Sequence, residues 1–255
     1  MIARPALRRS WRVIVTVAGI AAVLCSCSSG GGAGSTATPY AGGRFDPRGV
    51  PLLPSPAAGE TDAAFQVASA ALQTLVGASG GATQFVGSVT LSGASVVDLL
   101  RASAGAGIAP AEARSRLIAL GWSWLVGRSA VEVRSSFARE WRVELLAFTS
   151  ATGADRYAAD PFLAPAALLA AGRQPPPEGA AAGAALYRAA ESVAVPVGPA
   201  TPAPGERAVL LWRRGRIVAV ASEAQAPPGL DLAALGVVSR QADSELVRVP
   251  GSVAP

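Results

Sequence analysis

The amino-acid sequence predicts an α+β fold, in which an antiparallel sheet has helices packed on one face, behind a signal peptide and a flexible tether. Three observations support this prediction. Apolar residues recur at helical spacing in 62–77. Apolar and charged residues alternate through 122–150, as in strands with one buried face. Two further apolar runs, 207–213 and 216–222, flank an Arg-Gly pair that is typical of a tight hairpin.

Residues 1–26 have the features of a signal peptide. Arginines at positions 4, 8, 9 and 12 precede an apolar run from Val13 to Leu24, which is short for a stable membrane span. The run leads into Leu24-Cys25-Ser26-Cys27, which resembles the lipobox of bacterial lipoproteins: a leucine three positions before the modified cysteine and a small residue directly before it. Cys27 fits this pattern, whereas Cys25 is directly preceded by the bulky Leu24.

The lipobox resemblance implies that Cys27 becomes the mature N-terminus and carries a diacylglyceryl thioether, usually with a further acyl chain. Two or more acyl chains hold a protein stably at a membrane. We therefore expect a lipid-anchored protein on the extracytoplasmic face of the cell membrane. A plain signal peptide or an uncleaved anchor is the alternative. The Arg8-Arg9 pair leaves open whether export follows the Sec or the twin-arginine route.

Charge argues against a nucleic-acid partner. The formal net charge of the 255-residue chain is +5, but four of its 22 basic residues and none of its 17 acidic ones precede Cys27, so the rest of the chain carries +1. No basic stripe interleaved with aromatic residues is present. All basic residues are arginine, and lysine and asparagine are absent, a bias that suggests a GC-rich genome and, with the lipobox, an actinobacterial source.

Missing residue types restrict the chemistry further. The sequence contains no histidine and no cysteine after Cys27. His/Cys metal sites, Ser-His-Asp and Cys-His catalysis, and disulfides within the mature domain are therefore excluded, and we expect no metal and no cofactor. Carboxylate pairs, a serine with an unusual base and an Asp/Glu site for magnesium or calcium remain as possible catalytic groups, but none has a recognisable spacing.

Composition divides the mature chain into a tether and a domain. Residues 27–61 are rich in glycine, serine and proline and lack apolar periodicity, which predicts a disordered tether reaching roughly 30 Å from the membrane. Tyr40 or Phe45 could serve there as a recognition hook. Residues 62–250 are expected to form the α+β extracytoplasmic domain, as one unit or two.

The first half of the domain is expected to alternate helix and strand. A helix over 62–77 is followed by a strand at 84–91, which is rich in β-branched residues. Ser95 can cap a short helix that includes Leu99 and Leu100. Pro110 is suited to start another helix, which stops at Gly121.

Three successive antiparallel strands are predicted at 122–128, 131–137 and 139–150. The residues expected to share a face within each strand are Trp122, Trp124 and Val126; Val131 and Val133; and Trp141, Val143 and Leu145. The charged residues expected on the solvent-exposed face are Glu132, Arg134, Arg142 and Glu144.

The remaining elements follow the same reasoning. A short helix over 150–160 is expected to turn Ala154, Tyr157 and Ala158 inward. The Pro/Gly/Ala-rich segment 173–184 predicts a mobile surface loop. Strands at 191–197, 207–213 and 216–222 follow, the last two joined at Arg214-Gly215, and a short helix ends near Gly236.

The middle of the chain contains these elements in order: a strand, the motif F-T-S-A-x-G-A-D-x-Y at Phe148–Tyr157, a Pro/Gly loop, a strand and a hairpin around an R-G turn. This order of elements resembles that of α+β surface lipoproteins of actinobacteria, many of which have no assigned function. This resemblance covers about 130–222. It implies an antiparallel sheet with helices on one face and an extracytoplasmic role, and it carries no binding residues across.

Three groups of side chains are candidates for a site. Trp122, Trp124, Trp141 and Trp212 could form a sugar-stacking platform or line a lipid pocket, but their positions on apolar strand faces favour the core. Glu132, Glu140 and Glu144 suggest a glycosidase, but alternation with Arg134, Arg139 and Arg142 favours a solvated strand face. Arg213, Arg214 and Arg216 form a basic turn that could contact anionic lipid.

The sequence thus favours a non-catalytic lipoprotein of the cell envelope that binds an envelope protein through its surface. The alternatives are a carrier with an apolar pocket for a lipid or glycan and a carboxylate-based hydrolase. Neither the ligand nor the oligomeric state follows from the sequence.

Overall fold

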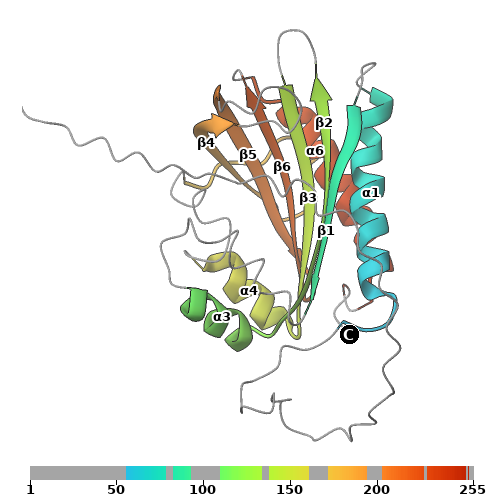
Figure 1. Cartoon of the computed structure of the whole chain (residues 1–255), viewed down its shortest axis with the longest axis vertical. Helices are drawn as coiled ribbons and strands as arrows, with labels where there is room; N and C mark the ends of the chain where they lie inside the picture. The colour runs from blue at the N-terminus through green and yellow to red at the C-terminus, as the bar shows by residue number, and fades with distance from the viewer. Residues whose placement is uncertain are drawn as a thin grey trace, which may run out of the picture.

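The computed structural model describes residues 56–78, 83–92, 110–133, 138–160, 172–193, 203–226, 229–250 and 252. Its centre is a six-stranded sheet with the order β1-β2-β3-β6-β5-β4, in which every neighbouring pair is antiparallel. The predicted α+β fold with an antiparallel sheet is confirmed (Figure 1). The signal peptide, Cys27, most of the tether and the helix predicted after Ser95 lie outside the described residues.

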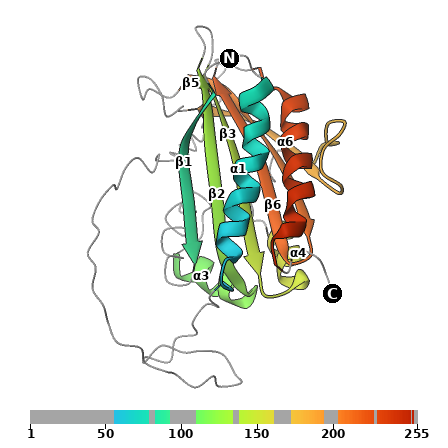
Figure 2. The same cartoon turned by 90° about the vertical axis from the view of Figure 1, so that its right-hand side faces the viewer.

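Two long helices cover one face of the sheet. Helix α1 (Glu60–Ala78) and helix α6 (Leu232–Glu245) run side by side over it, and the short 3-10 helix η3 (Leu246–Arg248) follows α6 (Figure 2). We call this the α1/α6 face. Helix α1 begins two residues before the expected boundary, because Glu60 already lies in its first turn. No described helix is long and apolar enough to cross a membrane.

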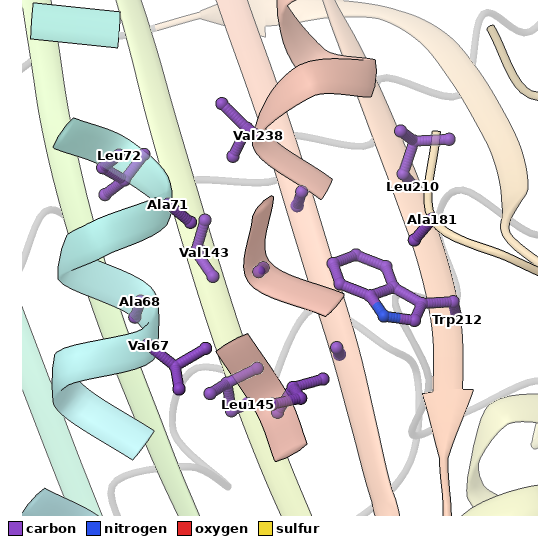
Figure 3. Packing of buried hydrophobic residues seen from close by; sticks show 14 of the residues in the cluster. Val67, Ala68, Ala71, Leu72, Val143, Leu145, Ala181, Leu210, Trp212 and Val238 are labelled. Carbon is purple, nitrogen blue, oxygen red and sulfur yellow. The ribbon is translucent and has the colours of Figure 1, made fainter. Parts of the chain in front are cut away.

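The α1/α6 face carries the larger core. Small alanines on α1 let the helix approach the sheet, where valine and leucine side chains of β3 fill the space (Figure 3). On the other side of this core, Trp212 packs with Leu210 of the same strand and with Ala181 from the segment before β4. The labelled residues of this core are Val67, Ala68, Ala71, Leu72, Val143, Leu145, Ala181, Leu210, Trp212 and Val238.

A second core lies at one end of the opposite face, under helices α3 (Pro110–Ala119) and α4 (Ala151–Ala159) (Figure 1). Pro110 opens α3 as predicted. The Ser150 side chain caps α4 by accepting the backbone N–H of Gly153 at 3.0 Å. Buried Ala154 and Tyr157 confirm the predicted inner face of this helix, and the Tyr157 ring packs on Phe148. We call this the α3/α4 face.

Strand β2 (Trp122–Val133) corrects the expected arrangement, because one continuous strand replaces the two predicted at 122–128 and 131–137. Neighbouring strands β1 (Thr83–Ser92) and β3 (Ala138–Phe148) pair with it across the predicted break. Gly127, at the end of the first predicted strand, is no turn residue: a Cβ atom there would lie 2.8 Å from the Val89 side chain, so the strand passes through it closely packed.

The predicted shared face of Trp122 and Trp124 is also wrong. Trp122 pairs with Phe148 and Trp124 with Ala147, so Ser123 is an extra residue in the ladder. Such a bulge reverses the alternation of side chains along a strand. Trp122 therefore enters the core of the α3/α4 face, while Trp124 enters the core of the α1/α6 face.

The last three strands are β4 (Ala185–Val193), β5 (Ala203–Arg214) and β6 (Ile217–Ala226). The predicted hairpin between β5 and β6 is confirmed, with Arg214 paired to Ile217 and Gly215 in the turn at a φ of 54°. Strand β4 begins six residues earlier than predicted, and Ala185 and Leu186 at its start are buried.

The segment expected to be a mobile loop, 173–184, is packed against α6. Ala181 is buried and its N–H donates to the Ser239 hydroxyl at 3.1 Å. A Cβ atom at Gly236 would come within 3.3 Å of the Glu178 carbonyl oxygen and of Pro177. Gly236 is thus an interior contact point of a helix that continues to Glu245, and not the helix end that the sequence suggested.

Candidate functional site

A mostly buried group of charged and polar side chains is centred on Arg139 of β3, on the α1/α6 face. The register places Glu132 of β2 and Gln225 of β6 opposite Arg139, on either side of it. Glu223 lies two residues before Gln225 and therefore on the same face. Because three adjacent strands contribute, the group forms only in the folded sheet. We call Glu132, Arg139, Glu223, Gln225 and Asp231 the Arg139 cluster.

The guanidinium of Arg139 contacts every other member of the cluster. Its Nε lies 2.7 Å from Gln225 Oε1 and 2.8 Å from Glu223 Oε1. Its Nη1 lies 3.5 Å from Glu132 Oε2 and 3.9 Å from Asp231 Oδ2. The same guanidinium lies over the Trp141 ring, 5.3 Å from the ring centroid, so the ring covers one face of the guanidinium.

Glu223 connects this cluster to the beginning of α6. The side chain is 0% exposed, and both of its oxygens accept the backbone N–H of Asp231, at 2.9 and 3.0 Å. Asp231 in turn caps α6 by accepting the Ala234 N–H at 3.0 Å. Burial raises the pKa of Glu223 to about 7, against the opposing influence of the Asp231 N–H and Arg139.

A buried carboxyl group with a raised pKa is suited to act as a general acid, but its surroundings here hold the fold together. Arg139 lies between Glu132 and Glu223, where a substrate would have to bind. The cluster fastens the start of α6 to the centre of the sheet. Among the described residues, no three potential ligands are placed to hold a metal ion.

The three carboxylates predicted from sequence do not lie on one solvated face. Glu132 is 3% exposed and belongs to the α1/α6 face, while Glu140 is 8% exposed and lies on the α3/α4 face with Glu144. Arg142, between them on β3, contacts Glu140 at 3.0 Å and Glu144 at 3.5 Å. The sequence correctly suggested ion pairing, but the hairpin register separates Glu132 from the other two.

The basic turn at the β5–β6 hairpin is used inside the molecule. Arg213 pairs with Asp155 of α4 at 2.5 Å, and Arg214 binds Asp243 of α6 through two contacts, at 2.9 and 3.0 Å. Arg216 pairs with Glu60 of α1 and also donates to the carbonyl oxygens of Phe148 and Pro250, each at 3.0 Å. One turn therefore anchors three helices from both faces of the sheet.

All four candidate tryptophans are buried, which confirms the core interpretation. Trp124, Trp141 and Trp212 belong to the core of the α1/α6 face, and Trp122 to that of the α3/α4 face. The indole N–H groups of Trp122, Trp124 and Trp212 are buried without a hydrogen-bond acceptor in the described part of the chain.

Sequence reasoning missed two charged residues that the structure brings into prominence. Every second residue of β6 from Ile217 to Ala221 is buried, and Glu223 is the next position in this series. The sequence could therefore have predicted that the Glu223 carboxylate points into the core. Arg128, in the middle of β2, had no such signal, because its aromatic neighbours Phe65 and Phe85 come from other elements.

Comparisons with known proteins give little beyond this geometry. No protein-family model and no curated protein matches the chain. The structure is similar to the extracellular domain of PknH from Mycobacterium tuberculosis, with a TM-score of 0.42 and 10% sequence identity, covering 71% of this chain and 95% of that domain.

Proposed function

We propose that this chain is a cell-envelope lipoprotein, anchored to the membrane through Cys27, whose folded part binds another envelope protein and has no catalytic role. The anchor is supported by the lipobox-like Leu24-Cys25-Ser26-Cys27 and by the preceding basic and apolar segments. The tether composition of 27–61 supports a domain held at some distance from the lipid surface.

The absence of a catalytic role rests on one observation: the buried carboxylates are neutralised by arginines instead of converging on a free site. Glu140 and Glu144 lie two residues to either side of Arg142 on β3, and all three residues belong to the α3/α4 face. Arg142 contacts both of these glutamates, so the space between them is occupied.

The pair Glu132 and Glu223 is equally unsuited to hydrolysis. Arg139 contacts both side chains, at 3.5 Å and 2.8 Å, and so occupies the space between them. A hydrolase would need access for a sugar and for a water molecule at this point. The observed contacts serve the attachment of α6 to the sheet.

A lipid or glycan carrier is the second candidate, and one observation favours it. Three buried indole N–H groups lack acceptors in the described residues, and an unsatisfied buried donor costs roughly 1 to 3 kcal/mol. A bound molecule with oxygen atoms would supply such acceptors. Native mass spectrometry of the protein purified from its membrane separates the candidates: a stoichiometric lipid or glycan would favour the carrier over the interaction module.

Mass spectrometry of the mature N-terminus tests the anchor. We expect diacylglyceryl-modified Cys27 as the first residue, and Cys27→Ala should leave the precursor unprocessed. Cys25→Ala is the matched control and should be processed normally. Recovery of a water-soluble mature chain that begins at another residue would contradict the lipoprotein proposal.

A further inference from the structure

Arg128 is a half-buried cation that pairs with no carboxylate of the described residues. It lies in the middle of β2, and its guanidinium carbon is 4.8 Å from the centroid of the Phe65 ring and 4.5 Å from that of Phe85. Its Nε is buried and has no hydrogen-bond acceptor in the part of the chain that the structure describes. Two aromatic faces stabilise a guanidinium, but they leave its hydrogen-bond donors free.

The position of the guanidinium is set by the edge strand. Phe85 belongs to β1, so the Arg128 side chain reaches from β2 over the outermost strand of the sheet. A bulge between Phe85 and Gly87 makes this possible, because it turns Phe85 towards the α1/α6 face while Val89 and Leu91 pack on the opposite one. The guanidinium of Arg128 therefore lies between helix α1 and the edge strand β1, a place that we call the α1/β1 seam.

A second unsatisfied group lies along the same seam. Ser69 follows Phe65 by one turn of α1, on the same side of the helix. Its hydroxyl is buried and has no hydrogen-bond partner in the described part of the chain. Two polar groups next to Phe65 thus lack partners among the described residues, and each could bind an oxygen atom of a ligand.

Strand β1 itself is open to an additional strand. It pairs with β2 on one side and with no described strand on the other. Its ten residues, Thr83–Ser92, include no charged residue and no proline. Edge strands usually carry such residues to prevent pairing with other chains, so an uncharged edge beside an unpaired arginine is a feature to explain.

We infer that an extended acidic segment of a partner protein adds to the outer edge of β1 and places a carboxylate on Arg128. The inference deepens the interaction role proposed above and rests on it. The flat guanidinium edge between two rings matches a planar carboxylate, which it can bind through two hydrogen bonds. The outer backbone groups of β1 after Thr83, which pair with no described strand, favour an extended chain over a small anion, because only a chain can satisfy them as well.

Binding of a labelled peptide to the full chain in detergent tests this inference by fluorescence anisotropy. The probe is acetyl-Thr-Val-Glu-Val-Thr-amide, and its Gln analogue is the neutral control. We expect the Glu peptide to bind about tenfold or more tightly than the Gln peptide, as for a charge-assisted hydrogen bond. In Arg128→Gln the two peptides should bind equally.

Ser88 offers a matched pair of variants, because it lies directly opposite Arg128 in the β1–β2 register and is exposed. A carboxylate in Ser88→Glu would face Arg128 and occupy it from within the chain. This variant should melt at a higher temperature than the parent protein and lose the preference for the Glu peptide. Ser88→Gln should retain that preference.

Equal binding of both peptides to the parent protein, or no binding of either, would overturn the inference. Inorganic phosphate competing for Arg128 while neither peptide binds would show a small-anion site, which also overturns it. Failure of Cys27 lipidation would contradict the proposed anchor and leave these binding results unaffected. A partner that co-purifies equally with the parent protein and with Ser88→Glu would support the interaction role but exclude the β1 edge as the binding site.

Discussion

Trp122 and Trp124 are separated by one residue of β2, yet their side chains fill two different cores on opposite faces of the sheet. The extra residue Ser123 causes this division. The two tryptophans therefore belong to different cores: Trp122 to the core of the α3/α4 face, and Trp124 to the core of the α1/α6 face. Their energetic contributions should reflect the separation.

We expect Trp122→Ala and Trp124→Ala each to lower the free energy of unfolding by about 3 to 5 kcal/mol, because each leaves a cavity in a filled core. The double variant should show additive effects within about 0.5 kcal/mol, since the side chains share no core. Trp124→Ala combined with Trp141→Ala, within one core, should deviate from additivity. Urea unfolding measures all three, and a Trp→Ala variant with unchanged stability would point to a ligand pocket instead.

Stability should fall as the pH rises from about 4.5 to 7, because of Glu223. Its pKa is about 7 in the folded protein and 4.5 in an ordinary environment, so in this range the folded state holds a proton that the unfolded state has released. The loss amounts to at most about 3 kcal/mol. Glu223→Gln should flatten the pH dependence of unfolding, whereas Glu112→Gln, exposed on α3, should preserve it. An unchanged slope in Glu223→Gln would contradict the assignment.

The arginines of the β5–β6 turn should differ widely in their effect on stability. Arg216→Met leaves the Glu60 side chain, 2% exposed, without its guanidinium, which we expect to cost about 3 to 5 kcal/mol. Arg213→Met removes a pair with Asp155, which is 59% exposed, and should cost less than about 1 kcal/mol. Thermal unfolding of the two variants measures these losses of stability. Similar losses would show that burial does not determine how much each ion pair contributes to stability.

Gly153→Ala should destabilise the protein although alanine favours helices. A Cβ atom at this position of α4 would lie 2.1 Å from the Leu120 carbonyl oxygen, so the helix must move away from the end of α3. We expect a loss of about 1 to 3 kcal/mol in chemical denaturation. Thr152→Ala, on the exposed side of the same turn, is the control and should change stability by less than about 0.7 kcal/mol.

Local sequence patterns were sufficient for most elements, because their causes are local. Alternation in Trp141, Val143 and Leu145 reports one strand face directly, and the Arg214-Gly215 pair between two apolar runs predicts a hairpin. The packing of 173–184 on α6 could not be predicted in this way. Alanine is equally common in exposed loops and in tight contacts, so composition alone did not distinguish them.

The candidate site was harder to predict from the sequence than the fold. The Arg139 cluster requires β3 to lie beside β6, and no local pattern specifies that pairing. The bulges at Ser123 and between Phe85 and Gly87 decide which side chains face Trp141 or Arg128. Ser123 carries no local signal for a bulge, and Gly87 does not by itself say which side chains the bulge redirects. Long-range register was therefore the missing information.

The strand order has a consequence for how this molecule could be assembled. Strands β1, β2 and β3 are consecutive neighbours, as are β4, β5 and β6, and β3–β6 is the single junction between strands that are not consecutive in the described chain. Each half brings one long helix, α1 or α6, to the shared face. Two separately expressed polypeptides, divided in the connection between α4 and β4, should complement each other in trans, and the Arg139–Glu223 contact would form only upon their reassociation.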